Sequence, residues 1–258
     1  DHIGLINVVF ITPSDIGLIH DNSDERRRFA DICICQFDQQ YLHYLSEYGK
    51  LIDTRNRQLK QFNVSGVFDP IIMESIDMRL LVAGNYIHEK RKHFLNGLQQ
   101  YFTAFYKLVS GEKDVVGFEY KSDLNETGFQ QILTESIQKD RILERTTKGV
   151  HKDDIEFTIS GFPLKKYGSQ GQSKSFLIAL KLAQFAYQRD VSGTNPILLL
   201  DDIFEKIDEQ RAQNLIDLIA GEGFGQILIT DTHRERVEKH LLPLDKPKKF
   251  VLLNHVSS

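Results

Sequence analysis

The sequence is poor in cysteine and has no long hydrophobic run. Only Cys33 and Cys35 occur among its 258 residues, and no other cysteine or paired histidine completes a metal-ligand pattern. We expect both to be core-facing thiols in a reducing compartment. No apolar stretch reaches the roughly 18 residues that a membrane span needs, and no signal-peptide pattern opens the chain. A cytoplasmic protein with no membrane contact is therefore expected.

An excess of positive charge is also absent. The formal net charge of -4 at pH 7 excludes a protein that coats nucleic acid by bulk charge. Any contact with DNA must use local basic clusters, and each cluster has ordinary solvated surface as its alternative. The clusters are Arg26-Arg27-Arg28, Lys90-Arg91-Lys92, Lys165-Lys166, and Lys246 with Lys248-Lys249.

Two segments have apolar residues at helical spacing. The first begins near a candidate N-cap at Ser23 or Asp24 and continues as one long helix to a break at residues 64–66. The second begins at Pro70 and continues to Leu108, with Gly111 as a plausible stop. We expect these helices to pack antiparallel as a projecting arm.

The remaining pattern alternates strands with helices. Strands are predicted at 6–11, 115–120, 155–159, 197–201, 226–230 and 250–253, and helices at 129–142, 173–187 and 209–219, with a short helix before the last strand. This alternation predicts an α/β lobe with a mostly parallel sheet. The lobe would comprise residues 1–23 and 149–258, and the arm residues 24–148. The helix at 173–187 is apolar nearly all round, so we expect it to be sandwiched inside.

A short glycine-bearing loop, Tyr167-Gly168-Ser169-Gln170-Gly171-Gln172, leads into this apolar helix. Free backbone N–H groups and the positive end of the helix dipole suit a phosphate. The alternative is that Ser169 only caps the helix, and the two roles can coexist.

The aliphatic run at residues 197–200 ends in two carboxylates, Asp201 and Asp202. It indicates a buried parallel strand that delivers acids to a metal or a water at its C-terminal edge. A helix-capping and surface role is the alternative for the pair.

Five stretches in order resemble the RecF family, DNA repair proteins of the SMC-like branch of ABC-type ATPases. They are residues 7–10 with Pro13-Ser14-Asp15; residues 25–31 followed by Arg55-Asn56; residues 149–154; residues 167–172; and residues 198–208. Together they span nearly the whole chain. The resemblance implies an ABC-type ATPase lobe that is interrupted by a helical arm.

The resemblance also implies roles for the motif residues, with ATP and Mg²⁺ as cofactors. Asp202 stands where ABC-type ATPases usually have a glutamate, so we expect slow hydrolysis. The implied roles are γ-phosphate contact in trans for Ser169, Gly171 and Gln172; a water-mediated Mg²⁺ contact for Asp201; orientation and deprotonation of the attacking water for Asp202; and a D-loop position at a dimer interface for Asp208, which has helix capping as its alternative.

A DNA-binding clamp is the implied function. Its members form ATP-dependent homodimers at gaps and single-strand/double-strand junctions, work with RecR and RecO to load recombinase, and support the SOS response. Candidate DNA contacts are Arg26, Arg27, Lys152, Lys165 and Lys166.

Two histidines lie near the motifs. His151 either faces DNA or positions the turn between the arm and the sheet. The switch histidine of the family aligns with Asp231, and we expect His233, two residues further on, to be a surface residue.

No Gly-x-x-x-x-Gly-Lys-Ser/Thr loop occurs anywhere in the sequence. In the family, this P-loop lies in an N-terminal segment before the matching region. The chain also starts at Asp1 without an initiator Met, so we expect a fragment that does not bind or hydrolyse ATP alone. Two other interpretations stay open: a non-catalytic module for DNA and protein binding, and another SMC-like ATPase, which would need a longer coiled-coil insertion.

Overall fold

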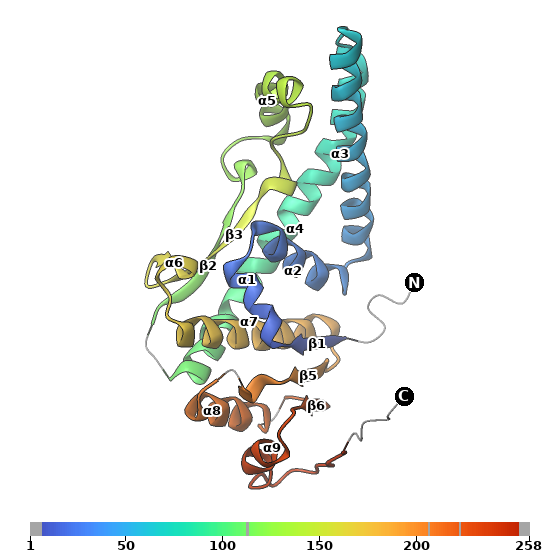
Figure 1. Cartoon of the computed structure of the whole chain (residues 1–258). Coiled ribbons are helices and arrows are strands. Elements are labelled where there is room, and N and C mark those ends of the chain that lie inside the picture. The colour runs from blue at the N-terminus through green and yellow to red at the C-terminus, as the bar shows by residue number, and fades with distance from the viewer. Residues whose placement is uncertain (1–6, 112–113, 206, 222, 253–258) are drawn as a thin grey trace, which may run out of the picture.

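Two small sheets and a long helical hairpin organise the chain, as Figure 1 shows for this computed structural model. The structure describes residues 7–111, 114–205, 207–221 and 223–252. Its helices are α1 (Gly17–His20), α2 (Ser23–Cys35), α3 (Gln39–Ser65), α4 (Pro70–Ser110), α5 (Phe129–Leu143), α6 (Leu164–Tyr167), α7 (Gln170–Ser192), α8 (Glu209–Ile219) and α9 (Arg234–Leu241). Its strands are β1 (Val8–Ile11), β2 (Val116–Lys121), β3 (Asp154–Ile159), β4 (Phe162–Pro163), β5 (Ile197–Asp201) and β6 (Ile227–Thr230).

The first sheet is parallel, with the strand order β1-β5-β6. Val8 pairs with Ile197 at one end, and Leu200 pairs with Ile229 near the other. Parallel strands place their carboxyl ends at one edge, so β5 and β6 end side by side there. The predicted parallel sheet is confirmed, and the strands at 197–201 and 226–230 lie in it as expected.

The second sheet is antiparallel and has the order β2-β3-β4. β3 is a strand as predicted, but it pairs with β2, from Val116↔Ile159 to Lys121↔Asp154. Residues 155–159 were predicted only as a strand of the lobe, and this strand lies in the antiparallel sheet rather than beside the parallel strands. A local alternating pattern identifies a strand but not its partner. The predicted domain limits remain a prediction, although their boundary at 148/149 separates two paired strands.

A break near residue 37 divides the first predicted long helix. α2 ends at Cys35, and the Asp38 carboxylate caps α3 by accepting a hydrogen bond from the Tyr41 N–H at 2.8 Å. The expectation of one helix is wrong because the apolar spacing continues through Phe37, which packs against the core across the break. Aspartate is a favoured N-cap because its side chain satisfies an otherwise unpaired N–H.

The second long helix is confirmed over its whole predicted length. Asp69 caps α4 by accepting hydrogen bonds from the N–H groups of Ile71 and Ile72. Gly111 ends it with a φ of 66°, which glycine adopts at no steric cost. α3 packs along α4, and Figure 1 shows this hairpin rising away from the parallel sheet. The predicted arm is therefore present.

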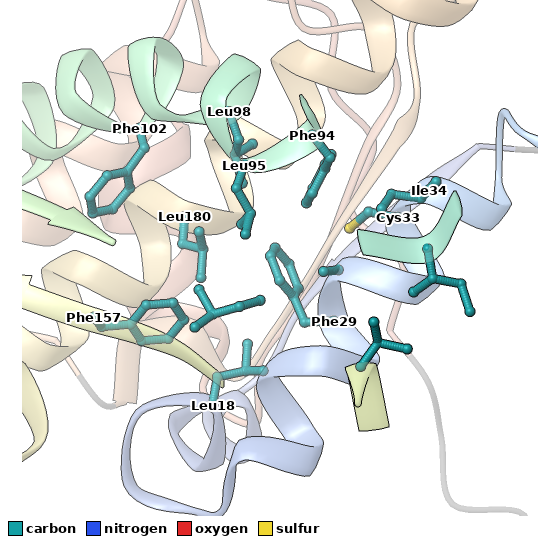
Figure 2. Close-up of a cluster of buried hydrophobic side chains, with 14 of the residues drawn as sticks. Leu18, Phe29, Cys33, Ile34, Phe94, Leu95, Leu98, Phe102, Phe157 and Leu180 are labelled. Atoms are coloured by element: carbon teal, nitrogen blue, oxygen red, sulfur yellow. The ribbon is translucent and has the colours of Figure 1, made fainter. Parts of the chain in front are cut away.

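α7 separates two hydrophobic cores. Its Phe176 and Leu180 pack in the larger core, among side chains of α2, α4 and β3 that Figure 2 shows around Phe29 and Phe102. On its other side, Leu182 packs with the strands of the parallel sheet. The expectation that this helix is sandwiched is confirmed. Its two apolar faces explain why its sequence is hydrophobic nearly all round.

Both cysteines belong to the larger core, as expected. Cys33 has no exposed surface and Cys35 is buried. Burial raises the pKa of the Cys33 thiol to about 12 and that of Cys35 to about 11. Both thiols are therefore protonated at neutral pH and pack as small apolar groups.

Three arginines join the arm to the sheets in a buried cluster that we call the arginine joint. Arg91 of α4 forms a bidentate ion pair with Asp31 of α2, at 2.8 and 2.9 Å, and donates to the Val150 carbonyl at 2.7 Å. The other members are Arg26, which pairs with Asp154 at 2.7 and 3.0 Å, and Arg27, which donates to the Asp153 carbonyl.

Another buried arginine, Arg55, ties the arm together further from the sheets. Arg55 of α3 has no exposed surface and pairs with Asp140 of α5 at 2.5 Å and with Asp77 of α4 at 2.7 Å. Its guanidinium also donates to the Thr146 hydroxyl, and the neighbouring Asn56 amide accepts from the Thr146 N–H. Three helices thus converge on one side chain.

Over its described residues, 250–252, the predicted strand at 250–253 does not form. Residues 250–252 are exposed and irregular, and Leu253 lies outside the described residues, as does the predicted start of the first strand at Ile6. A strand needs a neighbour for its backbone hydrogen bonds, and no described strand pairs with this segment. None of the described helices is long and apolar enough to cross a membrane.

Substitution of Arg91 tests the importance of the arginine joint. We expect Arg91→Ala to lower the free energy of unfolding by about 3–5 kcal/mol, because it removes the bidentate partner of the largely buried Asp31 carboxylate, which then keeps only the Tyr41 hydroxyl. Urea-induced unfolding measures this change. Arg79→Ala is the matched control, since Arg79 of the same helix pairs with Glu47 in solvent and such pairs contribute at most about 1 kcal/mol. Equal losses in the two variants would contradict the joint's role.

Candidate signature loop and paired carboxylates

The glycine-bearing loop forms the N-terminal cap of α7. The Ser169 Oγ accepts a hydrogen bond from the Gln172 N–H at 3.1 Å, and the Gln172 Oε1 accepts from the Ser169 N–H at 2.8 Å. This reciprocal pair is a capping box. The helix starts at Gln170 rather than at Ser173 as predicted, so Gly171 and Gln172 lie in its first turn. Ser169 is exposed, and its capping role is confirmed.

Gln172 also connects the loop to the end of the arm. Its Nε2 donates to the Asp114 carboxylate at 3.0 Å, and the same oxygen accepts from the Tyr106 hydroxyl of α4 at 3.3 Å. Asp114 lies between α4 and β2, 58 residues before Gln172. The long arm helix therefore reaches the glycine-bearing loop through one carboxylate.

The two candidate acids lie at the carboxyl edge of the parallel sheet. Asp201 is the last residue of β5, and its carboxylate accepts a hydrogen bond from the Thr230 hydroxyl at the end of β6. The Asp202 carboxylate accepts from the Thr232 N–H at 3.3 Å, and its own N–H donates to the Thr230 carbonyl at 3.1 Å. The end of β6 thus holds both acids in place.

Asp202 has a left-handed backbone, with a φ of 46°. Among residues with a side chain, aspartate and asparagine adopt this region most readily. This backbone is a structural reason for an aspartate at a position where ABC-type ATPases usually have a glutamate, because the longer acid adopts the left-handed region less readily.

The donor set fits a magnesium ion that is shared with phosphates. Among the described residues, no group of three or more His, Cys, Asp or Glu side chains is arranged to hold a metal ion. Mg²⁺ bound to a nucleotide usually takes only one or two protein carboxylates and completes its shell with water and phosphate oxygens. The partly exposed Asp201 can supply such a carboxylate.

Asp208 caps α8, as its alternative interpretation held. Its carboxylate accepts from the Arg211 N–H at 3.0 Å and pairs with the Arg211 guanidinium. These bonds to Arg211 hold the pKa of Asp208 below its usual value. Its D-loop position at a dimer interface remains a prediction.

The two histidines differ in their surroundings: His151 is hydrogen-bonded inside the molecule, and His233 lies on the surface. The His151 Nδ1 lies 2.9 Å from the Tyr48 hydroxyl, and its Nε2 lies 3.2 Å from the Thr146 carbonyl. Burial lowers the pKa of His151 from 6.5 to about 4, so the ring is neutral at pH 7. This arrangement supports the interpretation that His151 positions the turn. His233 is exposed as expected, and the neighbouring Asp231 carboxylate accepts from the His233 N–H at 2.7 Å.

The predicted basic contacts divide into two groups. Arg26 and Arg27 are buried in the arginine joint, where their guanidinium groups bind Asp154 and the Asp153 carbonyl, and their assignment as DNA contacts stays a prediction. Lys152, Lys165 and Lys166 are exposed. They remain candidate contacts.

Several site residues were missing from the prediction. Asp114 and Thr230 hold motif residues, and Ser175 accepts a hydrogen bond from Arg211, yet each carries an ordinary polar side chain that no local pattern distinguishes. Arg211 had a weak signal, since it lies three residues after Asp208 at the spacing of a helical ion pair.

The parallel sheet, the capped helix and the paired acids define an α/β lobe of the ABC-type ATPase class, here interrupted by a helical arm. No protein-family model matches the chain. It is 46% identical over 238 residues to the DNA replication and repair protein RecF of Flavobacterium johnsoniae, covering 92% of this chain and 66% of that protein. It is 42% identical over 250 residues to the RecF of Phocaeicola vulgatus, covering 96% and 67%. The chain belongs to the RecF family.

A solved structure agrees with this assignment. The recombination mediator protein RecF with ATP, of the RecFOR pathway, superposes with a TM-score of 0.80 and 26% identity, over 90% of this chain and 64% of that one. The chain spans about two thirds of the length of the curated relatives that it matches.

The depressed pKa of His151 predicts how stability depends on pH. The contribution of neutral His151 to the free energy of unfolding is fully present above pH 6.5 and is lost as pH falls toward 4. In this range the imidazole binds a proton in the unfolded chain but stays neutral in the folded protein. At about 1.4 kcal/mol per pKa unit, the loss is at most about 3 kcal/mol. Urea unfolding of the wild type and His151→Gln at pH 7 and pH 4.5 measures it. Parallel losses in both proteins would contradict the assignment.

Proposed function

We propose that this chain supplies three motifs of an ATPase that acts in DNA replication and repair. They are the signature loop at residues 169–172, the Walker B acid Asp201 with its neighbour Asp202, and the D-loop at Asp208. The observation that carries the proposal is the combination of an exposed, Ser169-capped helix start with the Asp201-Asp202 pair at the sheet edge. Membership of the RecF family supports it, because the relatives are named as DNA replication and repair proteins.

The residues of this chain would serve two nucleotide sites. Ser169, Gly171 and Gln172 contact the γ-phosphate of ATP on a second subunit, since a hydroxyl and first-turn N–H groups are suitable donors. Asp201 holds Mg²⁺ through water next to ATP on its own subunit, and Asp202 orients and deprotonates the attacking water. The bound Mg²⁺ would neutralise charge on the phosphates. A solved RecF bound to ATP supports the nucleotide.

ATP would act as a clamp that holds a homodimer on DNA. We propose that the dimer binds gaps and single-strand/double-strand junctions in the cytoplasm, that it helps RecR and RecO to load recombinase, and that it supports the SOS response. The RecFOR pathway of the solved relative supports these partners. Lys165 and Lys166, exposed just before the signature loop, are the candidate phosphate contacts.

The chain alone should not bind ATP. Its sequence has no P-loop, and the residues described above contact only the γ-phosphate, Mg²⁺ and the attacking water. Isothermal titration calorimetry with ATP and Mg²⁺ should show no heat of binding. A micromolar dissociation constant would contradict this division of the site.

Full-length protein carrying a P-loop segment should hydrolyse ATP slowly in a DNA-stimulated reaction. Asp202→Asn should abolish turnover, because the amide cannot accept the proton of the attacking water. Asp217→Asn is the matched control, an exposed aspartate on α8 that lies outside the proposed site. Wild-type turnover of roughly 1–100 per second would contradict slow hydrolysis. Unchanged DNA and partner binding without ATP would instead favour a non-catalytic binding module.

A further inference from the structure

Arg211 lies between the two parts of the chain that are expected to meet a second subunit. Its guanidinium pairs with the Asp208 carboxylate on the D-loop side, and its Nε donates to the Ser175 hydroxyl of α7 at 2.8 Å. Ser175 is fully buried, five residues into the helix that Ser169 caps. One side chain therefore bridges the starts of α7 and α8.

Gly171 fits against the same guanidinium. A Cβ atom built at Gly171 would lie 3.3–3.4 Å from the Arg211 guanidinium nitrogens and carbon, which is tighter than nine in ten real Cβ contacts. Gly171 has no such atom, so the planar group can lie close to the first turn of the signature helix. The glycine of the loop thus leaves room for Arg211 as well as for a phosphate.

Asp208 is held by both the backbone and the side chain of Arg211. Its carboxylate accepts from the Arg211 backbone N–H at 3.0 Å and from the Arg211 side chain. The D-loop aspartate therefore cannot turn away from α8 without breaking the contact that also reaches Ser175. A guanidinium suits this position because its N–H donors are fixed in one plane and can bind two acceptors at once, whereas a lysine ammonium is a compact charge on a flexible stem.

We propose that Arg211 is a positioning residue that makes the signature loop and the D-loop one rigid unit, so that both engage the ATP of the partner subunit together. The proposal rests on the proposed function, and it names the residue that sets the geometry in trans. Arg211 itself does not contact the nucleotide.

The test uses full-length protein and compares Arg211→Ala with the wild type. ATP binding to isolated subunits at low concentration should be unchanged, because that site lies on the other half of each subunit. ATP-dependent dimerisation in analytical ultracentrifugation and steady-state hydrolysis should each fall roughly tenfold to a hundredfold, the usual range of coupling between sites. Arg234→Ala is the control, since Arg234 forms an exposed pair with Glu238 on α9.

Mixing two impaired variants, at a protein concentration at which both still dimerise with ATP, separates action in trans from action in cis. A dimer of one Arg211→Ala subunit and one Asp202→Asn subunit contains one intact site, which combines Asp202 of the first with the signature loop of the second. Random mixing should restore about a quarter of the wild-type rate, because half of the dimers are mixed and each has one active site of two. No recovery on mixing would overturn the proposal.

Other outcomes are also decisive. If wild-type protein neither dimerises nor hydrolyses ATP, the proposed function fails and this proposal fails with it. If the wild type is active and Arg211→Ala is equally active, only the role of Arg211 fails. If Arg211→Ala has a lower melting temperature than the wild type, Arg211→Lys replaces it with the same expectations, because lysine keeps the charge but cannot bridge Asp208 and Ser175 together.

Discussion

The ion pair between Arg91 and Asp31 is the contact on which the arrangement of arm and sheets depends. It is bidentate and buried, and the same guanidinium reaches the Val150 carbonyl before β3. A buried charge is costly unless every donor is used, so the three segments must adopt one relative position. Arg26 and Asp154, which are 128 residues apart in the sequence, form a second bidentate ion pair that holds α2 against β3. The stretches that resemble the RecF family near residues 25–31 and 149–154 are the two sides of this joint.

Much of the fold could be predicted because the spacing of apolar residues along the sequence shows which face of a helix or strand is buried. The apolar spacing of α4 and the all-round apolar surface of α7 both correspond to observed packing. The failures have physical causes. Phe37 kept the apolar spacing across the break before α3, and the pairing of β3 with β2 is a long-range contact that no local pattern contains. The apolar residues at 250–252 resemble a strand but have no strand beside them.

The site was predictable where a residue type carries its own chemistry. The serine that caps α7 and the acids at the end of β5 lie where the motifs indicated. The basic residues were harder, because a charge in a sequence does not reveal its partner. Arg26 and Arg27 suggested a DNA surface, whereas their partners Asp153 and Asp154 hold them inside the molecule. The residues that position the motifs, such as Thr230 and Asp114, are recognisable only from distances.

α4 extends without interruption through 41 residues, a rod of about 60 Å. Its outer half forms the arm with α3, while its inner end packs on α7 and α8, and Tyr106 contacts the carboxylate that holds Gln172. A rod fixed at the arginine joint behaves as a lever with its fulcrum at Arg91. Because Arg91 lies near the middle of α4, a displacement of the inner end of the helix would move the arm tip by a similar distance in the opposite direction.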